Sequence, residues 1–117
     1  MAKRNQSKPN SEQVTKRLLE MLETAKNGNF DRIELEWQHE GLEVTFFTGS
    51  KGVGGIPFEA GEDSAVLELI DAHTKFKPSG QGRCDLSGLG WGTPIDVEEY
   101  NSFGESCLRL RLKPKAK

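Results

Sequence analysis

The sequence predicts an α+β fold: a two-layer sandwich with two helices on one face of an antiparallel sheet of about four strands, in the order α-β-β-α-β-β. Three observations predict this fold. Apolar residues near the N-terminus follow a helical period, apolar residues in later segments alternate, and the sequence contains no strand–helix–strand repeat. With 117 residues the chain has material for one core, so we expect a single domain over 10–113. A disordered basic tail at 1–9 and a basic tail at 114–117 would flank it.

The first helix is predicted to begin at Asn10 or Ser11, because either side chain can cap the first turn. Gln13, three residues after Asn10, also fits a capping box. Asn27-Gly28 is a typical C-terminal stop. Between these ends the apolar residues follow the 3.6-residue period of one helix face: Val14, Leu18, Met21, Leu22 and Ala25.

Residues 32–46 predict an antiparallel hairpin with one buried and one solvated side. Apolar residues alternate with polar ones in both halves: Ile33, Leu35 and Trp37, then Leu42, Val44 and Phe46. A two-residue turn at 40–41 would place Trp37 opposite Val44 and Leu35 opposite Phe46. The opposite side, with its glutamates, would face water.

The next segment, TGSKGVGGIP at 48–57, contains four glycines and a lysine, as phosphate-binding loops do. In the motif G-x-x-x-x-G-K-[ST] the lysine follows the glycines, whereas Lys51 comes before the Gly-Val-Gly-Gly run. The dinucleotide motif opens straight into a helix, but here the next helix begins later, with Glu62 and Asp63, which would repel a phosphate. We therefore interpret 48–57 as a mobile connection or the tip of a binding loop.

A second helix is predicted at 62–76, with acidic residues in its first turn. Lys75 and Lys77 near its end complement the helix dipole, and Pro78 would terminate it. The apolar face would consist of Val66, Leu67, Leu69, Ile70 and His73.

In the glycine-rich region that follows, Cys84 and Leu86 alternate, and Leu89 and Trp91 would extend them into a bent or bulged strand broken by Gly88, Gly90 and Gly92. Residues 87–103 remain open to two interpretations, a strand or a long ordered loop. The last strand is predicted from the alternation of Leu108, Leu110 and Leu112 with basic residues, and Pro114 ends it.

Charge is segregated along the chain. Residues 1–17 contain five bases and one acid, and residues 106–117 contain five bases and no acid, so both ends are positive. Residues 18–105 contain six bases and 17 acids. An acidic body between two basic ends bears on partners and solubility rather than on the fold.

The sequence offers little for catalysis, and we predict that the protein is not an enzyme and takes no metal or cofactor. His39 and His73 have no metal-ligand spacing, and Cys84-Asp85 would need a histidine brought close by the fold to form a nucleophile–base pair. A carboxylate cluster at 96–99 is expected to be solvated.

The two cysteines, Cys84 and Cys107, lack the spacing of a disulfide framework or a zinc site. No apolar segment has the length of a membrane span, and no secretory signal precedes the first helix. We expect both thiols to be buried and reduced in a cytoplasmic protein. A disulfide between them would require their strands to be neighbours.

The function predicted from these features is a small cytosolic protein-binding or regulatory module. It would neutralise a cationic partner such as a toxin or nuclease, because an acidic surface can compete for a basic cleft. The residues predicted to bind are Glu34, Glu36, Glu43, Phe47, Lys51, Val53 and Ile56. The interpretation weighed against it is that the glutamates are a solvated sheet face opposed by Arg109 and Arg111 of the last strand. Phe47, on the wet side, would need a partner or cover from the following loop.

The alternative function is nucleic-acid binding through the basic ends, since Lys and Arg contribute sequence-independent affinity for phosphate. No aromatic residues are interleaved with these bases, and the acidic body would oppose binding. The residues of this alternative are Lys3, Arg4, Lys8, Arg109, Arg111, Lys113, Lys115 and Lys117.

Overall fold

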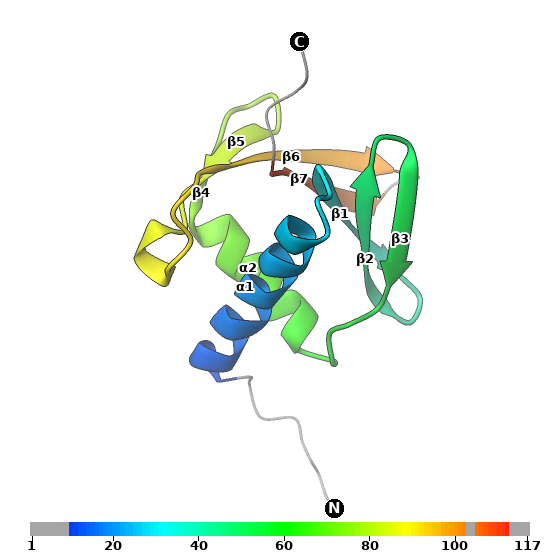
Figure 1. The fold of residues 1–117 in the computed structure, drawn as a ribbon, viewed down its shortest axis with the longest axis horizontal. Coiled ribbons are helices and arrows are strands. Elements are labelled where there is room, and N and C mark those ends of the chain that lie inside the picture. The colour runs from blue at the N-terminus through cyan, green and yellow to red at the C-terminus, as the bar shows by residue number, and fades with distance from the viewer. Residues whose placement is uncertain (1–9, 103–104, 113–117) are drawn as a thin grey trace, which may run out of the picture.

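The computed structural model describes residues 10–102 and 105–112, and the two predicted tails at 1–9 and 114–117 lie outside this part (Figure 1). Its two helices are α1 (Ser11–Asn27) and α2 (Glu62–Ala72). Its strands are β1 (Arg32–Gln38), β2 (Gly41–Thr48), β3 (Lys51–Gly55), β4 (Thr74–Phe76), β5 (Gln81–Cys84), β6 (Ile95–Ser102) and β7 (Glu105–Arg111). A short 3-10 helix, Ser87–Leu89, separates β5 from β6.

The seven strands form one sheet in the order β3-β2-β1-β7-β6-β5-β4, and each neighbouring pair is antiparallel. The α+β class and the antiparallel sheet are confirmed. The predicted architecture is nevertheless wrong, because the sheet has seven strands rather than about four. Three strands are unexpected. β3 lies in a segment that the sequence predicts as a loop, β4 in one that it predicts as a helix, and β6 in the segment that it leaves open.

Helix α1 begins and ends where its local signals predict. The Asn10 side chain caps it: Oδ1 accepts the backbone N–H groups of Glu12 at 2.7 Å and Gln13 at 3.4 Å. The predicted apolar stripe is its buried face. At the other end the Gly28 N–H donates to the Thr24 carbonyl at 3.0 Å.

The predicted β1–β2 hairpin is present, but its turn is His39-Glu40 and its register differs. Leu35 lies opposite Val44, and Trp37 lies opposite Leu42. The predicted pairing was displaced by two residues, which leaves every side chain on its correct face, because a period of two cannot distinguish such registers. Gly41, with φ +144°, begins β2 instead of lying in the turn.

The glycine-rich segment after β2 is a strand, not a mobile loop. Gly49, with φ +60°, occupies the first position of a two-residue turn, as in type II′ hairpins. β3 then pairs with β2, so that Gly52 lies opposite Phe47. A Cβ atom on Gly52 would lie 2.7 Å from the Phe47 ring, so the missing side chain leaves room for an aromatic ring to cross the strand.

Helix α2 ends at Ala72, four residues earlier than predicted, and the chain continues as β4. Thr74 favours this end, since its hydroxyl donates to the Ile70 carbonyl at 2.6 Å and satisfies one of the last acceptors of the helix. Pro78 lies in the β4–β5 turn rather than at a helix end. There the Gly80 N–H donates to the Lys77 carbonyl at 2.9 Å.

The predicted bent strand through Trp91 is shorter in the structure. β5 ends at Cys84, and the chain then turns through the 3-10 helix. The segment 95–102, left open by the sequence, is the strand β6, whose Ile95 and Val97 are buried. The last strand, β7, spans 105–111, and Pro114 lies outside the described residues.

Both helices lie on the same side of the curved sheet (Figure 1). Their buried residues and the inward residues of the strands form one hydrophobic cluster, with Leu18, Leu22, Ile70 and Leu110 at most 1% exposed. We call the opposite side of the sheet the outer face. In the described part, neither helix is long and apolar enough to cross a membrane.

Candidate functional sites

The outer face carries side chains in rows that cross the strands, because residues directly opposite one another point to the same side of a sheet. The first row contains Lys75, Arg83, Asp96, Arg111, Arg32, Phe47 and Gly52. The second contains Gln81, Glu98, Arg109, Glu34, Thr45 and Gly54. The third contains Tyr100, Cys107, Glu36 and Glu43. Charge is therefore sorted across this face: the first row is mainly basic, the second is mixed, and the third is acidic.

Glu34, one of the predicted binding residues, is the centre of an internal network. Its Oε2 accepts the Nε groups of Arg109 at 3.0 Å and Arg32 at 3.1 Å, and its Oε1 accepts the Tyr100 hydroxyl at 3.2 Å. Arg109 also donates to Glu98 at 2.8 Å. Partial burial opposes ionisation of Glu34, but the two arginines outweigh it and hold the pKa of the carboxyl below its ordinary value. Glu34 and Arg109 are thus already paired with each other.

The same network changes the chemistry of Tyr100. Burial and the negative charge of Glu34 raise the pKa of the phenol to about 12. Since the sequence contains one tyrosine, the ultraviolet absorbance of phenolate reports Tyr100 alone. We expect a titration midpoint about two units above that of the urea-unfolded chain, near 10. Glu34→Gln removes the negative charge and should lower the folded midpoint. Circular dichroism must show that the fold persists, and coincident midpoints for the two proteins would refute the coupling.

Two other predicted residues, Glu36 and Glu43, form an acidic pair. They lie directly opposite each other on β1 and β2. Glu43 accepts the Gln38 side-chain amide at 3.3 Å, but within the described ranges no Lys or Arg lies at ion-pair distance from either glutamate. Like charges directly opposite each other destabilise a sheet. The pair is therefore a local concentration of unneutralised negative charge on β1 and β2, near the β3 edge of the sheet.

Phe47 does not require an external partner for its ring. The guanidinium of Arg32 lies 4.4 Å from the ring centroid on one side, and the ring crosses the Gly52 position of β3 on the other. Arg32 is in turn held by Asp31 and by the Gly49 carbonyl at 2.9 Å. The sequence leaves open whether a partner or the following loop covers the Phe47 ring. In the fold, the segment that follows Phe47 provides this cover.

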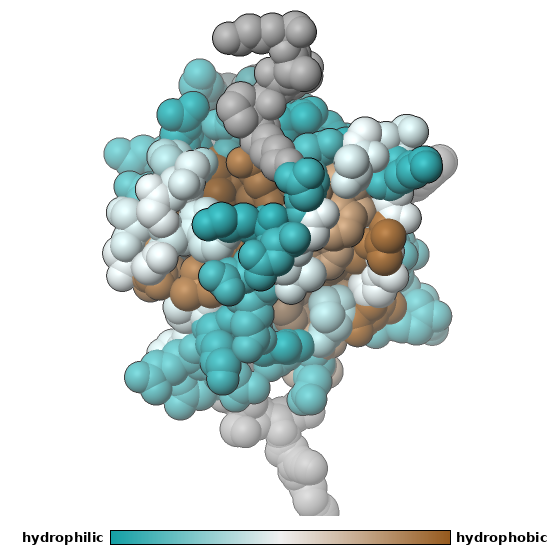
Figure 2. Space-filling model, viewed as in Figure 1, coloured by the Kyte–Doolittle hydropathy of each residue, from teal (hydrophilic) through white to brown (hydrophobic). Residues whose placement is uncertain are grey.

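The remaining residues of the predicted binding set lie on or just after the edge strand β3. All five residues of this strand are exposed, and β2 is its one neighbour in the sheet. Val53 is 64% exposed and Ile56 is 41% exposed, and they are the exposed large hydrophobic residues of the described chain. Figure 2 shows apolar side chains at the surface on the side where β2 and β3 lie. We call Lys51–Ile56 the edge segment.

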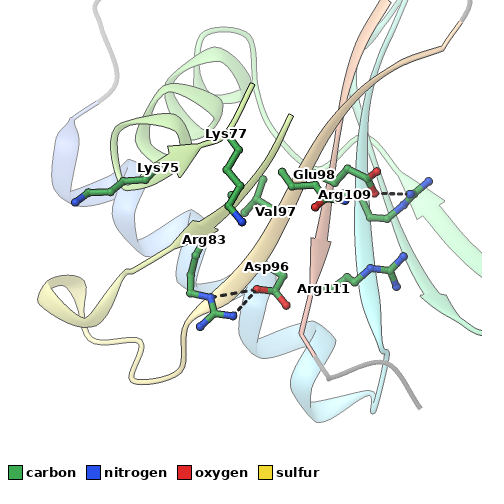
Figure 3. Close-up of a pocket in the computed structure, with 10 residues that line it drawn as sticks. Lys75, Lys77, Arg83, Asp96, Val97, Glu98, Arg109 and Arg111 are labelled. Carbon is green, nitrogen blue, oxygen red and sulfur yellow. Dashed lines mark hydrogen bonds and ion pairs between the residues drawn. The ribbon is translucent and has the colours of Figure 1, made fainter. Parts of the chain in front are cut away.

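At the other end of the sheet, the outer face is hollowed into a basic groove with a volume of about 780 Å³. Its charged lining residues are Lys75, Lys77, Arg83, Asp96, Glu98, Arg109 and Arg111. Figure 3 shows the Lys77 side chain pointing toward the middle of the groove, with Lys75 at the rim. Both acids are already paired, Asp96 with Arg83 at 3.2 Å and Glu98 with Arg109. The cations left over are Lys75, Lys77 and Arg111.

The sequence did not predict the groove as a site, although two of its residues, Arg109 and Arg111, belong to the nucleic-acid alternative. Arg109 of that alternative is held by two glutamates. The others, Lys3, Arg4, Lys8, Lys113, Lys115 and Lys117, lie outside the described residues. A signal was present in the i, i+2 spacing of Lys75 with Lys77 and of Arg109 with Arg111, which places each pair on one side of a strand.

The possible nucleophile–base pair has the wrong environment for catalysis. Asp85 and His73 are neighbours, because the Asp85 N–H donates to the His73 carbonyl at 3.0 Å. Cys84, however, is 1% exposed, and burial raises the pKa of its thiol, which disfavours the thiolate. No disulfide joins it to Cys107, since β6 separates their strands. Among the described residues no cluster of three potential metal ligands occurs.

Comparison with known proteins adds no family to this description. No protein-family model matches the sequence, and no curated protein is similar to it.

Proposed function

We propose that this chain is a non-enzymatic protein-binding module that pairs the edge strand β3 with an extended, basic segment of a partner protein. The observation that carries the proposal is the open edge of β3, which is exposed along its whole length and contains the exposed Val53, with the exposed Ile56 just after it. Strand addition at such an edge combines backbone hydrogen bonds with side-chain contacts.

The composition of the edge segment supports strand addition. In a two-residue hairpin the residues that flank the turn exchange backbone hydrogen bonds, and the pattern then alternates. Gly52 and Gly54 therefore direct their N–H and C=O groups to the open side, without side chains in the way. Natural edges are usually blocked by proline, bulges or several charges, but β3 contains one charge, Lys51. The opposite edge, β4, is three residues long and is followed by Pro78.

The acidic pair supports a basic partner. A Cβ atom on Gly54 would lie 3.4 Å from Glu43 Oε2, so this carboxylate leans over β3 toward the open edge. A Lys or Arg on an added strand could reach it and relieve the repulsion between Glu36 and Glu43. A toxin or nuclease with a basic cleft is one concrete partner of this kind.

The experiment compares two doubly neutralised variants with the same net charge in affinity capture from the native host. Glu36→Gln with Glu43→Gln should lose the partner, whereas the matched control, Glu23→Gln with Glu68→Gln on the helices, should retain it. In the isolated protein the first variant should gain about 0.5 kcal/mol of stability, because a like-charge pair is removed. Loss of partner with gain of stability separates binding from folding.

Val53→Lys tests the edge itself, because it adds a charge to an exposed position without touching the core. We expect it to abolish capture while leaving the urea midpoint unchanged. Full recovery of the partner by this variant would exclude strand addition at β3, and full recovery by the Glu36/Glu43 variant would exclude a charge-directed partner.

A further inference from the structure

The basic groove differs from the edge segment in position, charge and shape, and it lies at the other end of the sheet. Five of its lining residues are basic and two are acidic. After the two internal ion pairs are formed, no acid of the described residues lies at ion-pair distance from Lys75, Lys77 or Arg111. Three cations without an internal ion pair therefore line one hollow, which favours an anionic ligand.

A fourth cation, Arg83, is only weakly held. Its side chain is 69% exposed and that of its partner Asp96 is 59% exposed, so water screens their ion pair and it contributes little. A phosphate could replace Asp96, because a guanidinium binds phosphate through two parallel hydrogen bonds. Arg109, by contrast, is held by Glu34 and Glu98.

The spacing of the cations requires a ligand with repeated anionic groups. Within the groove, the first row of the outer face places Lys75, Arg83 and Arg111 on three strands, with Asp96 on β6 among them. From β4 to β7 the row crosses three inter-strand steps, or about 14 Å at the usual strand separation. One phosphate group cannot contact such a row, whereas a chain of phosphates can.

The outer face also provides stacking surfaces of the kind that favour a nucleic acid over an acidic peptide. Arg109 lies 4.6 Å from the centroid of Tyr100, and Arg32 lies 4.4 Å from that of Phe47. Each guanidinium lies over a ring and its side chain remains partly exposed, at 26% for Arg109 and 21% for Arg32. Bases of single-stranded nucleic acids stack on such planes, whereas acidic side chains gain nothing from them.

The acidic body does not cancel this local charge. The helices cover the other side of the sheet, and charges farther apart than the Debye length of about 8 Å are largely screened at physiological salt. Among the outer-face acids whose side chains the structure describes, the unneutralised ones are Glu36 and Glu43, which lie in the third row on β1 and β2, outside the groove lining. We propose that the basic groove binds the phosphodiester backbone of a single-stranded nucleic acid.

The test measures binding of a fluorescent oligothymidylate to the full chain by anisotropy. With three phosphate contacts, the affinity should fall about 20-fold between roughly 50 and 200 mM salt, because single strands lose about 0.7 in logarithmic slope per contact. Lys75→Gln with Lys77→Gln should weaken binding at least about tenfold at low salt and flatten the salt dependence to about threefold. The matched control, Lys16→Gln with Lys26→Gln on α1, should bind like the wild type.

Five outcomes would overturn the proposal, and the first four each identify an alternative. Equal loss in the groove and control variants would mean nonspecific charge. Loss in a Lys113→Gln, Lys115→Gln, Lys117→Gln variant, with the groove variant unaffected, would transfer binding to the C-terminal lysines. Equal or tighter binding of an oligoglutamate of the same charge would point to an acidic protein segment. Binding of tripolyphosphate but not of the oligonucleotide would reduce the groove to a small-anion site, and no binding at all would end the proposal.

Discussion

Replacing Glu62 by Ala should lower the free energy of unfolding by about 2 kcal/mol, because it leaves several donors at the α1–α2 junction without an acceptor. Glu62 is 5% exposed. It accepts the Gln13 side-chain amide at 2.9 Å, the Glu59 backbone N–H at 3.1 Å and the Arg17 Nε at 3.4 Å. One carboxylate thus joins both helices to the chain that arrives from β3.

Arg17 extends the effect of this substitution. It also donates to the Pro57 carbonyl at 2.6 Å and lies 5.5 Å from the centroid of Phe58, which is buried. Without Glu62, the guanidinium keeps Glu20 of its own helix at 3.4 Å but loses its acidic partner on α2. The matched control is Glu68→Ala, an exposed glutamate of the same helix, which should change stability by less than about 0.5 kcal/mol.

The pH dependence gives a second measurement of the Glu62 network. Burial opposes ionisation, but the Glu59 N–H, Gln13 and Arg17 together hold the pKa of Glu62 below its ordinary value. A lowered folded pKa contributes stability that is present above the pKa of the unfolded chain and is lost as the pH falls through the folded pKa. Urea unfolding below about pH 5 should therefore show a steeper loss for the wild type than for Glu62→Gln, which does not titrate. Equal stabilities of Glu62→Ala and Glu68→Ala at neutral pH would refute this role.

Elements with a strong local signal could be predicted from the sequence. Helix α1 combines a side-chain cap at Asn10 with an unbroken apolar period, and each signal acts within the segment itself. The β1–β2 hairpin has an apolar period in both strands, so its faces were predictable. Its register was not, because the side-chain period is unchanged by a shift of two residues.

The missed strands have little signal of their own and depend on their neighbours. β3 is mostly glycine, so its sequence shows no alternation of apolar and polar side chains. It is a strand because it pairs with β2, whose side chains cross its glycines. The turn at Gly49-Ser50 was the one local clue. In β6 the apolar alternation stops after Val97, since Glu99 and Asn101 take the next two inward positions, and pairing with β7 extends the strand. The groove could not be located for a similar reason. The i, i+2 spacing of its cations indicates one side of each strand, but the strands that carry them come together only in the sheet, in the order β7-β6-β5-β4.

The glycine-rich region 80–92 provides the second test. Gly82 lies within β5, opposite Phe76 on one side and Val97 on the other. A Cβ atom there would lie 2.5 Å from the Lys75 carbonyl oxygen and 2.9 Å from the Thr74 methyl group. Gly82→Ala should therefore destabilise the protein by about 3 kcal/mol, the upper range for overpacking, since the obstacle is backbone rather than a flexible side chain.

Gly88→Ala is the matched control, because a Cβ atom at that position meets nothing within 4 Å. Its stability should be unchanged or slightly higher, by up to about 0.5 kcal/mol, since alanine restricts the unfolded chain more than glycine does. Urea unfolding compares the two variants directly. If both behave like the wild type, the close approach of β4 to β5 is not rigid, and the groove has no fixed wall on that side. If only Gly82→Ala is destabilised and its oligonucleotide affinity also falls, the packing of β4 on β5 is what positions Lys75 and Lys77 for the ligand.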